Sequence, residues 1–159
     1  MGERLVSDVA DTWWFQRRWS SFRRGSRRIA VEWDGGAAEA LLYDEGVPRT
    51  AAAVARALPL EVPVIHVAWS GEMCMGAETY ELGVHEAENE VRLVRPGDLT
   101  FDAKYGELGF VYGDAECRLP SGPNTVVVYG TLVDGLDAFA AWARRRRFDG
   151  LGFLRLVSS

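Results

Sequence analysis

The stretch IAVEWDGGAAEALLY, residues 29–43, indicates the fold more directly than any other part of the sequence. Its apolar residues Ile29, Val31 and Trp33 alternate with smaller or polar ones, which is the period of a strand with one buried face. The run Asp34-Gly35-Gly36 then favours a tight turn before the chain returns as a second strand. The stretch therefore predicts a β-hairpin.

Short strands and two helices are expected beyond this hairpin. Pro48 suits the first turn of a helix that Pro59 ends, and Asp134 is the expected cap of a second helix. That helix carries Arg144–Arg147 in its last turn, where positive charge suits the helix dipole, and it ends at Gly150. Further strand-like runs occupy residues 62–69, 90–94, 98–102, 107–112, 125–130 and 151–157. We expect a mainly β protein, a closed barrel of about eight strands with two capping helices.

Length and composition place this barrel in a single domain. The chain has 159 residues, of which 48% are hydrophobic and 26% are charged, values typical of globular proteins. No apolar run approaches the length of about 18 residues that a membrane span needs, and the first residues lack the layout of a secretory signal. Cys74 and Cys117 are too few for a disulfide framework. We expect a cytoplasmic protein without membrane contact.

The charge is divided unevenly along the chain. Residues 1–28 hold seven arginines and three acidic residues, a net charge of +4, whereas the remainder has a net charge of −9. The acidic body argues against nucleic-acid binding. We therefore divide the chain into an Arg/Trp-rich N-terminal extension, residues 1–27, and a barrel domain, residues 28–159.

The extension also carries aromatic residues. If it is helical, Phe15, Trp19 and Phe22 recur at spacings of four and three residues and form an aromatic stripe. Such a stripe can fold back on its own barrel, pack against a second copy in a homodimer, or dock on a partner protein.

Several segments of the barrel domain resemble known families. Residues 43–58 resemble the strand-to-helix passage of cyclophilins, in which Val-Pro-Lys-Thr-Ala opens the first capping helix; the corresponding residues here are Val-Pro-Arg-Thr-Ala. The remainder is similar to a family of uncharacterised bacterial and archaeal cyclophilin-like proteins, a domain of unknown function. This likeness rests on HVAWSGE (66–72), ENE (88–90), PGD (96–98), Tyr112-Gly113, GPN (122–124) and the helix that begins at Gly135-Leu136. The resemblance implies a cyclophilin-type barrel with two capping helices over residues 28–157.

The sequence departs from true prolyl isomerases in the residues that carry their activity. Those enzymes have a Phe-His-Arg segment, whose arginine polarises the proline amide, and a Gln-Gly-Gly-Asp run, and neither is present here. No arginine lies between Arg56 and Arg92. Without that cation the reaction loses its main electrostatic stabilisation, so we expect no prolyl isomerase activity.

The best group of candidate catalytic residues lies in the HVAWSGE segment. In an extended chain His66 and Ser70 point to one side and Trp69 to the other. A turn or bulge at Ser70-Gly71 would bring Glu72 into the same pocket. A carboxylate and an imidazole in an apolar, Trp-walled cavity can act as general base and acid, so Glu72 and His66 are the predicted catalytic pair.

Two further residues complete the predicted site. Tyr112 and Asn124, brought close by the fold, can hydrogen-bond a substrate carbonyl or enolate. Together with Trp69 and Ser70 they are the predicted ligand-binding residues.

Other kinds of site are disfavoured. The sequence has no H-x3-H, HExxH or CxxC spacing, so we expect no metal, and it has no dinucleotide fingerprint, so we expect no cofactor. Cys74 lies between two methionines and is interpreted as a buried apolar thiol. Glu86, Glu88 and Glu90 are interpreted as solvated charges in a loop.

Three functions fit these observations. The first is a cofactor-free enzyme of isomerase, cyclase or hydrolase type, which uses general acid–base chemistry on a small metabolite in the barrel pocket. The second is a non-catalytic module that binds a small ligand or a peptide in the same groove. The third is an interaction subunit that docks a partner through residues 1–27.

Overall fold

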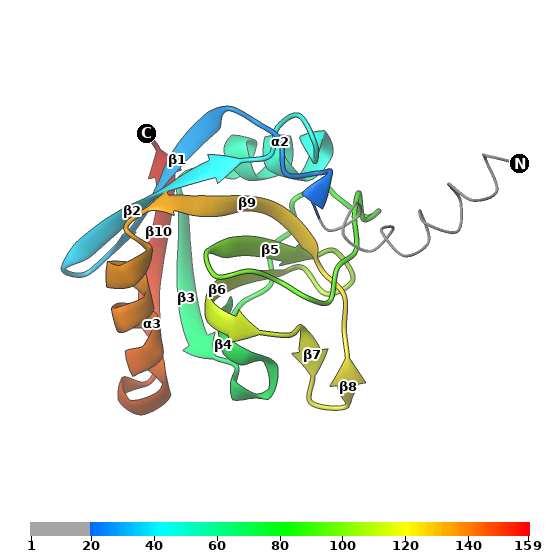
Figure 1. Cartoon of the computed structure of the whole chain (residues 1–159). Helices are drawn as coiled ribbons and strands as arrows, with labels where there is room; N and C mark the ends of the chain where they lie inside the picture. The colour runs from blue at the N-terminus through cyan, green and yellow to red at the C-terminus, as the bar shows by residue number, and fades with distance from the viewer. Residues whose placement is uncertain (1–19) are drawn as a thin grey trace, which may run out of the picture.

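A computed structural model describes residues 20–159 and consists of one closed β-barrel with two α-helices and a small separate hairpin (Figure 1). The eight barrel strands follow one another around the barrel in the order β1-β10-β3-β4-β6-β5-β9-β2. Their bounds are β1 Arg27–Trp33, β2 Gly36–Leu42, β3 Leu60–His66, β4 Gly71–Gly76, β5 Asp98–Asp102, β6 Glu107–Ala115, β9 Val127–Asp134 and β10 Gly152–Ser158. The predicted fold class, a mainly β barrel of eight strands with two helices, is confirmed.

The β1–β2 hairpin closes the barrel as the alternation of its residues predicts. All seven residues of β1 pair with β2, from Arg27 opposite Leu42 to Trp33 opposite Gly36. Ile29 and Val31 are fully buried, and Gly35 in the turn has φ +95°. On its other side β1 pairs with β10, so the two ends of the domain meet in the same sheet.

Two strand predictions differ from the structure. Residues 90–94 form only two isolated bridges, Val91 with Val126 and Leu93 with Glu116, rather than a strand. The run 62–69 ends as a strand at His66, and a short 3-10 helix, η1 (Ala68–Ser70), leads into β4, which was not expected. The chain reverses at Gly71, whose φ is +103°, within the predicted turn or bulge at Ser70-Gly71, and β4 begins beyond the predicted run.

Helix α2 (Pro48–Ala57) begins with proline at its first position, as predicted, and is capped by a distant carboxylate. The Glu88 side chain is only 7% exposed and accepts hydrogen bonds from the backbone N–H groups of Arg49 and Thr50, at 2.8 and 2.6 Å, and from the Thr50 hydroxyl. The interpretation of Glu88 as a solvated charge is therefore wrong, because it satisfies free N–H groups at a helix N-terminus.

Helix α3 (Leu136–Asp149) packs against β2, β3, β4 and β6 through Phe139 and Ala143. Its N-cap residue is Gly135 with φ +85°, not the expected Asp134, which ends β9. Phe139 packs against both Trp33 and Trp142, with ring centroids 5.6 and 6.1 Å away. Among the described residues, neither helix is long and apolar enough to cross a membrane.

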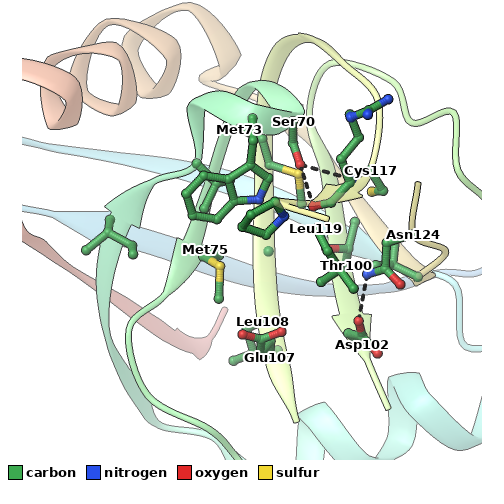
Figure 2. A pocket seen from close by; sticks show the side chains of 17 residues that line it. Ser70, Met73, Met75, Thr100, Asp102, Glu107, Leu108, Cys117, Leu119 and Asn124 are labelled. Atoms are coloured by element: carbon green, nitrogen blue, oxygen red, sulfur yellow. Dashed lines mark hydrogen bonds between the residues drawn. The ribbon is translucent and has the colours of Figure 1, made fainter. Parts of the chain in front are cut away.

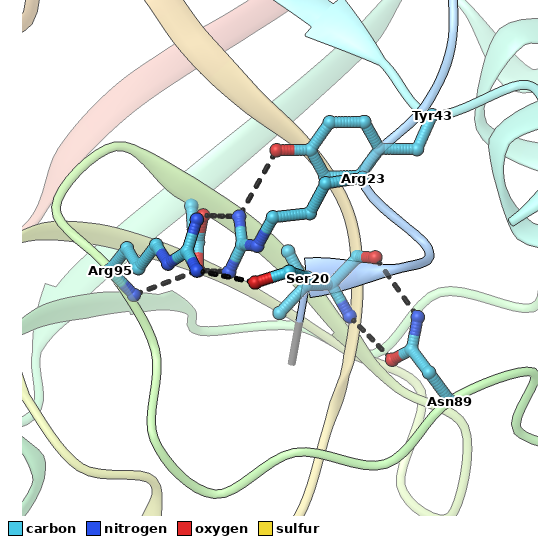
Figure 3. A network of polar contacts seen from close by, with 7 residues as sticks. Ser20, Arg23, Tyr43, Asn89 and Arg95 are labelled. Carbon is cyan, nitrogen blue, oxygen red and sulfur yellow. Dashed lines mark hydrogen bonds and ion pairs between the residues drawn. The ribbon is translucent and has the colours of Figure 1, made fainter. Parts of the chain in front are cut away.

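The last residues of the N-terminal extension pack into the barrel. Phe22 is 6% exposed and belongs to the hydrophobic core. Arg23 forms a bidentate ion pair with Asp98, at 2.7 and 2.8 Å, and donates to the Tyr43 hydroxyl (Figure 3). Most of the predicted aromatic stripe falls on residues 1–19, outside the described part, so the proposed domain division and docking role stay predictions.

Candidate functional site

A pocket of about 280 Å³ lies beside strands β3, β4, β5 and β6 and is bordered by the small hairpin β7–β8, Arg118–Leu119 and Gly122–Pro123 (Figure 2). Met73 and Met75 of β4 and Thr100 and Gly109 of the next strands form part of its lining. The remaining lining residues are mainly apolar: Ile65, Val67, Trp69, Ser70, Asp102, Glu107, Leu108, Cys117, Arg118, Leu119, Pro120, Asn124 and Val126.

Strand pairing determines which side chains reach this pocket. Met75 pairs with Gly109, and both line the pocket, whereas the neighbouring Cys74 contacts the Ala143 carbonyl of α3 at 3.6 Å. His66 pairs with Cys74. Because residues on paired positions share a face, His66 points with Cys74 toward α3 rather than into the pocket.

The six predicted site residues therefore fall into two groups. Trp69, Ser70 and Asn124 line the pocket. His66, Glu72 and Tyr112 are absent from its lining and lie on the side that faces α3. The turn at Ser70-Gly71 does not carry Glu72 into the pocket. Strand β4 begins after this turn, and its alternation points Met73 and Met75 toward the pocket and Glu72 to the opposite face.

Two of the pocket residues already have hydrogen-bond partners in the protein. The Ser70 hydroxyl accepts from the Arg118 N–H at 3.1 Å and donates to the Arg118 carbonyl oxygen at 3.2 Å, which ties η1 to β7. The Asn124 amide donates to Asp102 Oδ2 at 2.8 Å. Both side chains therefore hold the β7–β8 hairpin against the barrel, whereas Trp69, 43% exposed, is free to meet a ligand at the pocket rim.

The second group forms a polar cluster under α3. His66 Nε2 and the Tyr112 hydroxyl share a hydrogen bond of 2.6 Å, and the Arg144 guanidinium lies 5.3 Å from the centre of the Tyr112 ring. Glu72 accepts from the Asp114 N–H at 3.0 Å and lies 3.4 Å from Arg144. Burial and the positive charge of Arg147 lower the pKa of His66, so its imidazole is neutral at pH 7.

A pair of carboxyl groups, not anticipated from the sequence, lies at one end of the pocket. Asp102 and Glu107 are opposite each other where β5 and β6 meet, and Figure 2 shows them at the end away from Ser70. Burial, and then the charge of Asp102, raise the pKa of Glu107. The signal in the sequence is the turn 103–106, which places the two residues that flank it side by side in a hairpin.

Neither cysteine is placed to react. Cys74 and Cys117 are buried, and burial raises the pKa of each thiol to about 12. The interpretation of Cys74 as a buried apolar thiol is confirmed. Within residues 20–159, no three His, Cys, Asp or Glu side chains come together as metal ligands would.

The family model for a protein of unknown function, DUF3830, matches residues 29–158. The chain belongs to the DUF3830 family. No curated protein matches its sequence significantly.

Two solved structures share the fold of this DUF3830 chain. McbB, solved in complex with tryptophan, has a TM-score of 0.68 and 20% identity; the match covers 82% of this chain and 44% of McbB, so the chain spans less than half of that protein. The hypothetical protein AF2241 from Archaeoglobus fulgidus has a TM-score of 0.59 and 18% identity, with 86% of this chain and 98% of AF2241 covered. At these identities the likeness shows the fold alone.

Several residues that carry the family resemblance have structural roles in this DUF3830 chain. Glu88 caps α2, as described above. Asn89 exchanges two hydrogen bonds with the backbone of Val128, at 3.3 and 3.1 Å, and so continues the pairing of β9. Asp98 accepts from Arg23 and from the Arg95 N–H, and Asn124 holds Asp102. These segments stabilise the fold around the pocket.

Proposed function

We propose that this chain binds a small organic molecule with a flat apolar body in the 280 Å³ pocket. The observation that carries the proposal is the lining of this pocket, in which mainly apolar side chains, two methionines among them, surround the space. Gly109 of β6 belongs to this lining, and a Cβ there would come within 2.6 Å of Met73 Cε and would also collide with the Thr100 hydroxyl. The glycine therefore lets the Met73 and Thr100 side chains pack closely against β6 at the pocket wall.

The lining favours an aromatic ligand. Methionine side chains adapt to the shape of a bound molecule and make favourable contacts with aromatic rings. Trp69 at the rim offers an exposed ring on which a flat molecule can stack. McbB, whose fold is similar, binds tryptophan, a ligand of this kind.

Cofactor-free acid–base chemistry is the second candidate function, and the raised pKa of Glu107 favours it. A half-buried carboxyl whose pKa is raised is better suited than an ordinary glutamate to give and take a proton beside a bound ligand. The predicted pair Glu72 and His66 can act only on a molecule bound at the α3 side, since neither lines the pocket. Their catalytic role stays a prediction, as does partner docking through residues 1–27.

Blocking the pocket tests the first proposal. Ile65 is a half-buried residue of the pocket wall, so Ile65→Trp places a ring in the space that the ligand would occupy. We expect indole to bind the wild-type chain in isothermal titration calorimetry and to bind Ile65→Trp at least about ten-fold more weakly, a loss of about 1.4 kcal/mol. Leu151→Trp, at an exposed position outside the pocket lining, is the matched control and keeps the wild-type affinity. Equal binding by both variants, or no binding of indole by the wild-type chain, would overturn the proposal.

A further inference from the structure

One end of the pocket holds two carboxyl groups, and one cation lies beside it. Asp102 and Glu107 face each other across β5 and β6 and both line the pocket. The cation is Lys104, in the turn between these strands, whose Nζ lies 3.1 Å from Asp102 Oδ1 and donates to the Thr125 carbonyl at 2.9 Å. Lys104 is therefore engaged with Asp102.

The carboxylate of Asp102 has both hydrogen-bond donors and an ion-pair partner. It is 3% exposed, and besides Lys104 Nζ its oxygens accept from Asn124 Nδ2 at 2.8 Å and from the Lys104 N–H at 2.9 Å. These bonds compensate the loss of water around its charge.

Among the described residues, Glu107 is compensated only by the charge of Lys104, without a hydrogen bond. Within residues 20–159 its carboxyl group makes no hydrogen bond and no ion pair, although it is half-buried beside a second carboxylate. Because Lys104 pairs with Asp102, Glu107 has no ion-pair partner of its own among the described residues. Arg118, the cation within the lining, lies on β7 and is exposed to water.

We propose that Glu107 binds the positively charged head of the ligand, so that the ligand of this pocket is an aromatic or otherwise flat apolar molecule with a protonated amine. The ammonium group supplies an ion-pair partner for Glu107, and the apolar body packs on Met73 and Met75. The inference rests on the proposed function, since it assigns the charge of the molecule that the same pocket binds.

This arrangement makes binding depend on pH in a definite direction. An ammonium group favours the ionised form of Glu107, so the affinity for an amine falls as the pH is lowered through the raised pKa of Glu107. An anionic ligand with the same ring system behaves in the opposite way, because it binds better once Glu107 is protonated.

Three indoles that differ in the charge of the head group provide the test. Tryptamine is a cation, tryptophol is neutral and indole-3-acetate is an anion at neutral pH. In calorimetric titrations of the full chain at low salt we expect tryptamine to bind most tightly and indole-3-acetate least tightly, with about a ten-fold difference or more between them. Lowering the pH from about 7 to about 4 should weaken the binding of tryptamine, because the Glu107 carboxyl becomes protonated, and should leave the binding of the uncharged tryptophol unchanged.

Variants assign the preference to Glu107. Glu107→Gln keeps the shape and removes the charge, so it should bind all three indoles about as well as the wild-type chain binds tryptophol. Glu61→Gln removes an exposed carboxylate of β3 outside the pocket lining and should preserve the order of affinities.

Each outcome has a separate meaning. Tighter binding of indole-3-acetate than of tryptamine, or a tryptamine preference that survives in Glu107→Gln, would overturn this inference while leaving ligand binding in place. Equal affinities of the wild-type chain for the three indoles would overturn it as well. Failure of every indole to bind would overturn the proposed function itself.

Discussion

The ion pair between Arg23 and Asp98 joins the end of the N-terminal extension to the barrel, and removing it should destabilise the whole domain. The Asp98 side chain is fully buried and that of Arg23 is 9% exposed. Arg23→Met removes both charged hydrogen bonds to Asp98, at 2.7 and 2.8 Å, and leaves the Arg95 N–H at 2.8 Å as a partner of the carboxylate. The buried carboxylate then loses its bidentate ion-pair partner, while the charge of Arg95 still acts on it.

Breaking a buried ion pair by removing one partner costs about 3–5 kcal/mol. A domain of this kind is stable by about 5–15 kcal/mol, so the loss is a large share of the total. If the free energy of unfolding falls by about 2 kcal/mol for each molar of urea, the midpoint of urea unfolding should fall by about 2 M.

Urea unfolding of the full chain, followed by tryptophan fluorescence, measures the change. The neighbouring Arg24 is the matched control, because within residues 20–159 its guanidinium donates to the Ser21 carbonyl alone, in an exposed position. Arg24→Met should stay within about 0.5 kcal/mol of the wild-type chain. The double variant Arg23→Met/Asp98→Leu should recover part of the stability, because no unpaired charge is left behind. If Arg23→Met is as stable as Arg24→Met, residues 20–26 are not part of the folded barrel and the reasoning fails.

Four further results are expected. Phe139→Ala should lower the free energy of unfolding by about 3–5 kcal/mol, because Phe139 is 1% exposed and packs against two tryptophans; a change below about 0.5 kcal/mol would show that α3 does not pack there. Glu88→Ala removes the cap of α2 and should cost about 1–2 kcal/mol in urea unfolding, and an unchanged midpoint would contradict this role. Cys74 and Cys117 should not react with a thiol reagent at about pH 8 until the chain is unfolded in urea, since burial raises their pKa values to about 12; rapid labelling of the folded chain would argue against their burial. Glu107→Gln should change how stability depends on pH. Because the folded pKa of Glu107 is raised, its contribution is present below the ordinary glutamate pKa and is lost as the pH rises through the folded value, so the variant gains melting temperature relative to the wild-type chain as the pH rises from about 4. Parallel melting profiles for the two proteins would exclude a raised pKa.

The parts of the fold that were predicted correctly depend on local signals. The β1–β2 hairpin combines alternation with a glycine turn, and α2 begins at Pro48 as its sequence indicates. Strand β4 was missed because Met73, Cys74 and Met75 lack the β-branched or aromatic side chains typical of strands. Its existence depends on pairing with β3 and β6, which a local pattern does not reveal.

The candidate site was predicted only in part for the same reason. Trp69, Ser70 and Asn124 do line one pocket, but His66 and Glu72 lie on the other face, because β4 resumes its alternation after Gly71. The sequence suggests residue types suited to chemistry without indicating which already have partners. The Ser70 hydroxyl, for example, is occupied by the backbone of a hairpin 48 residues further along the chain.

Methyl NMR of the methionines tests the central claim, ligand binding in the pocket, most directly. Of the three methionines of the chain, Met73 and Met75 line the pocket. On titration of the methyl-labelled full chain with tryptamine, we predict that the Met73 and Met75 signals shift together and saturate, since an aromatic ring lies against both side chains. Met73 and Met75 signals that do not move at saturating tryptamine would contradict the account.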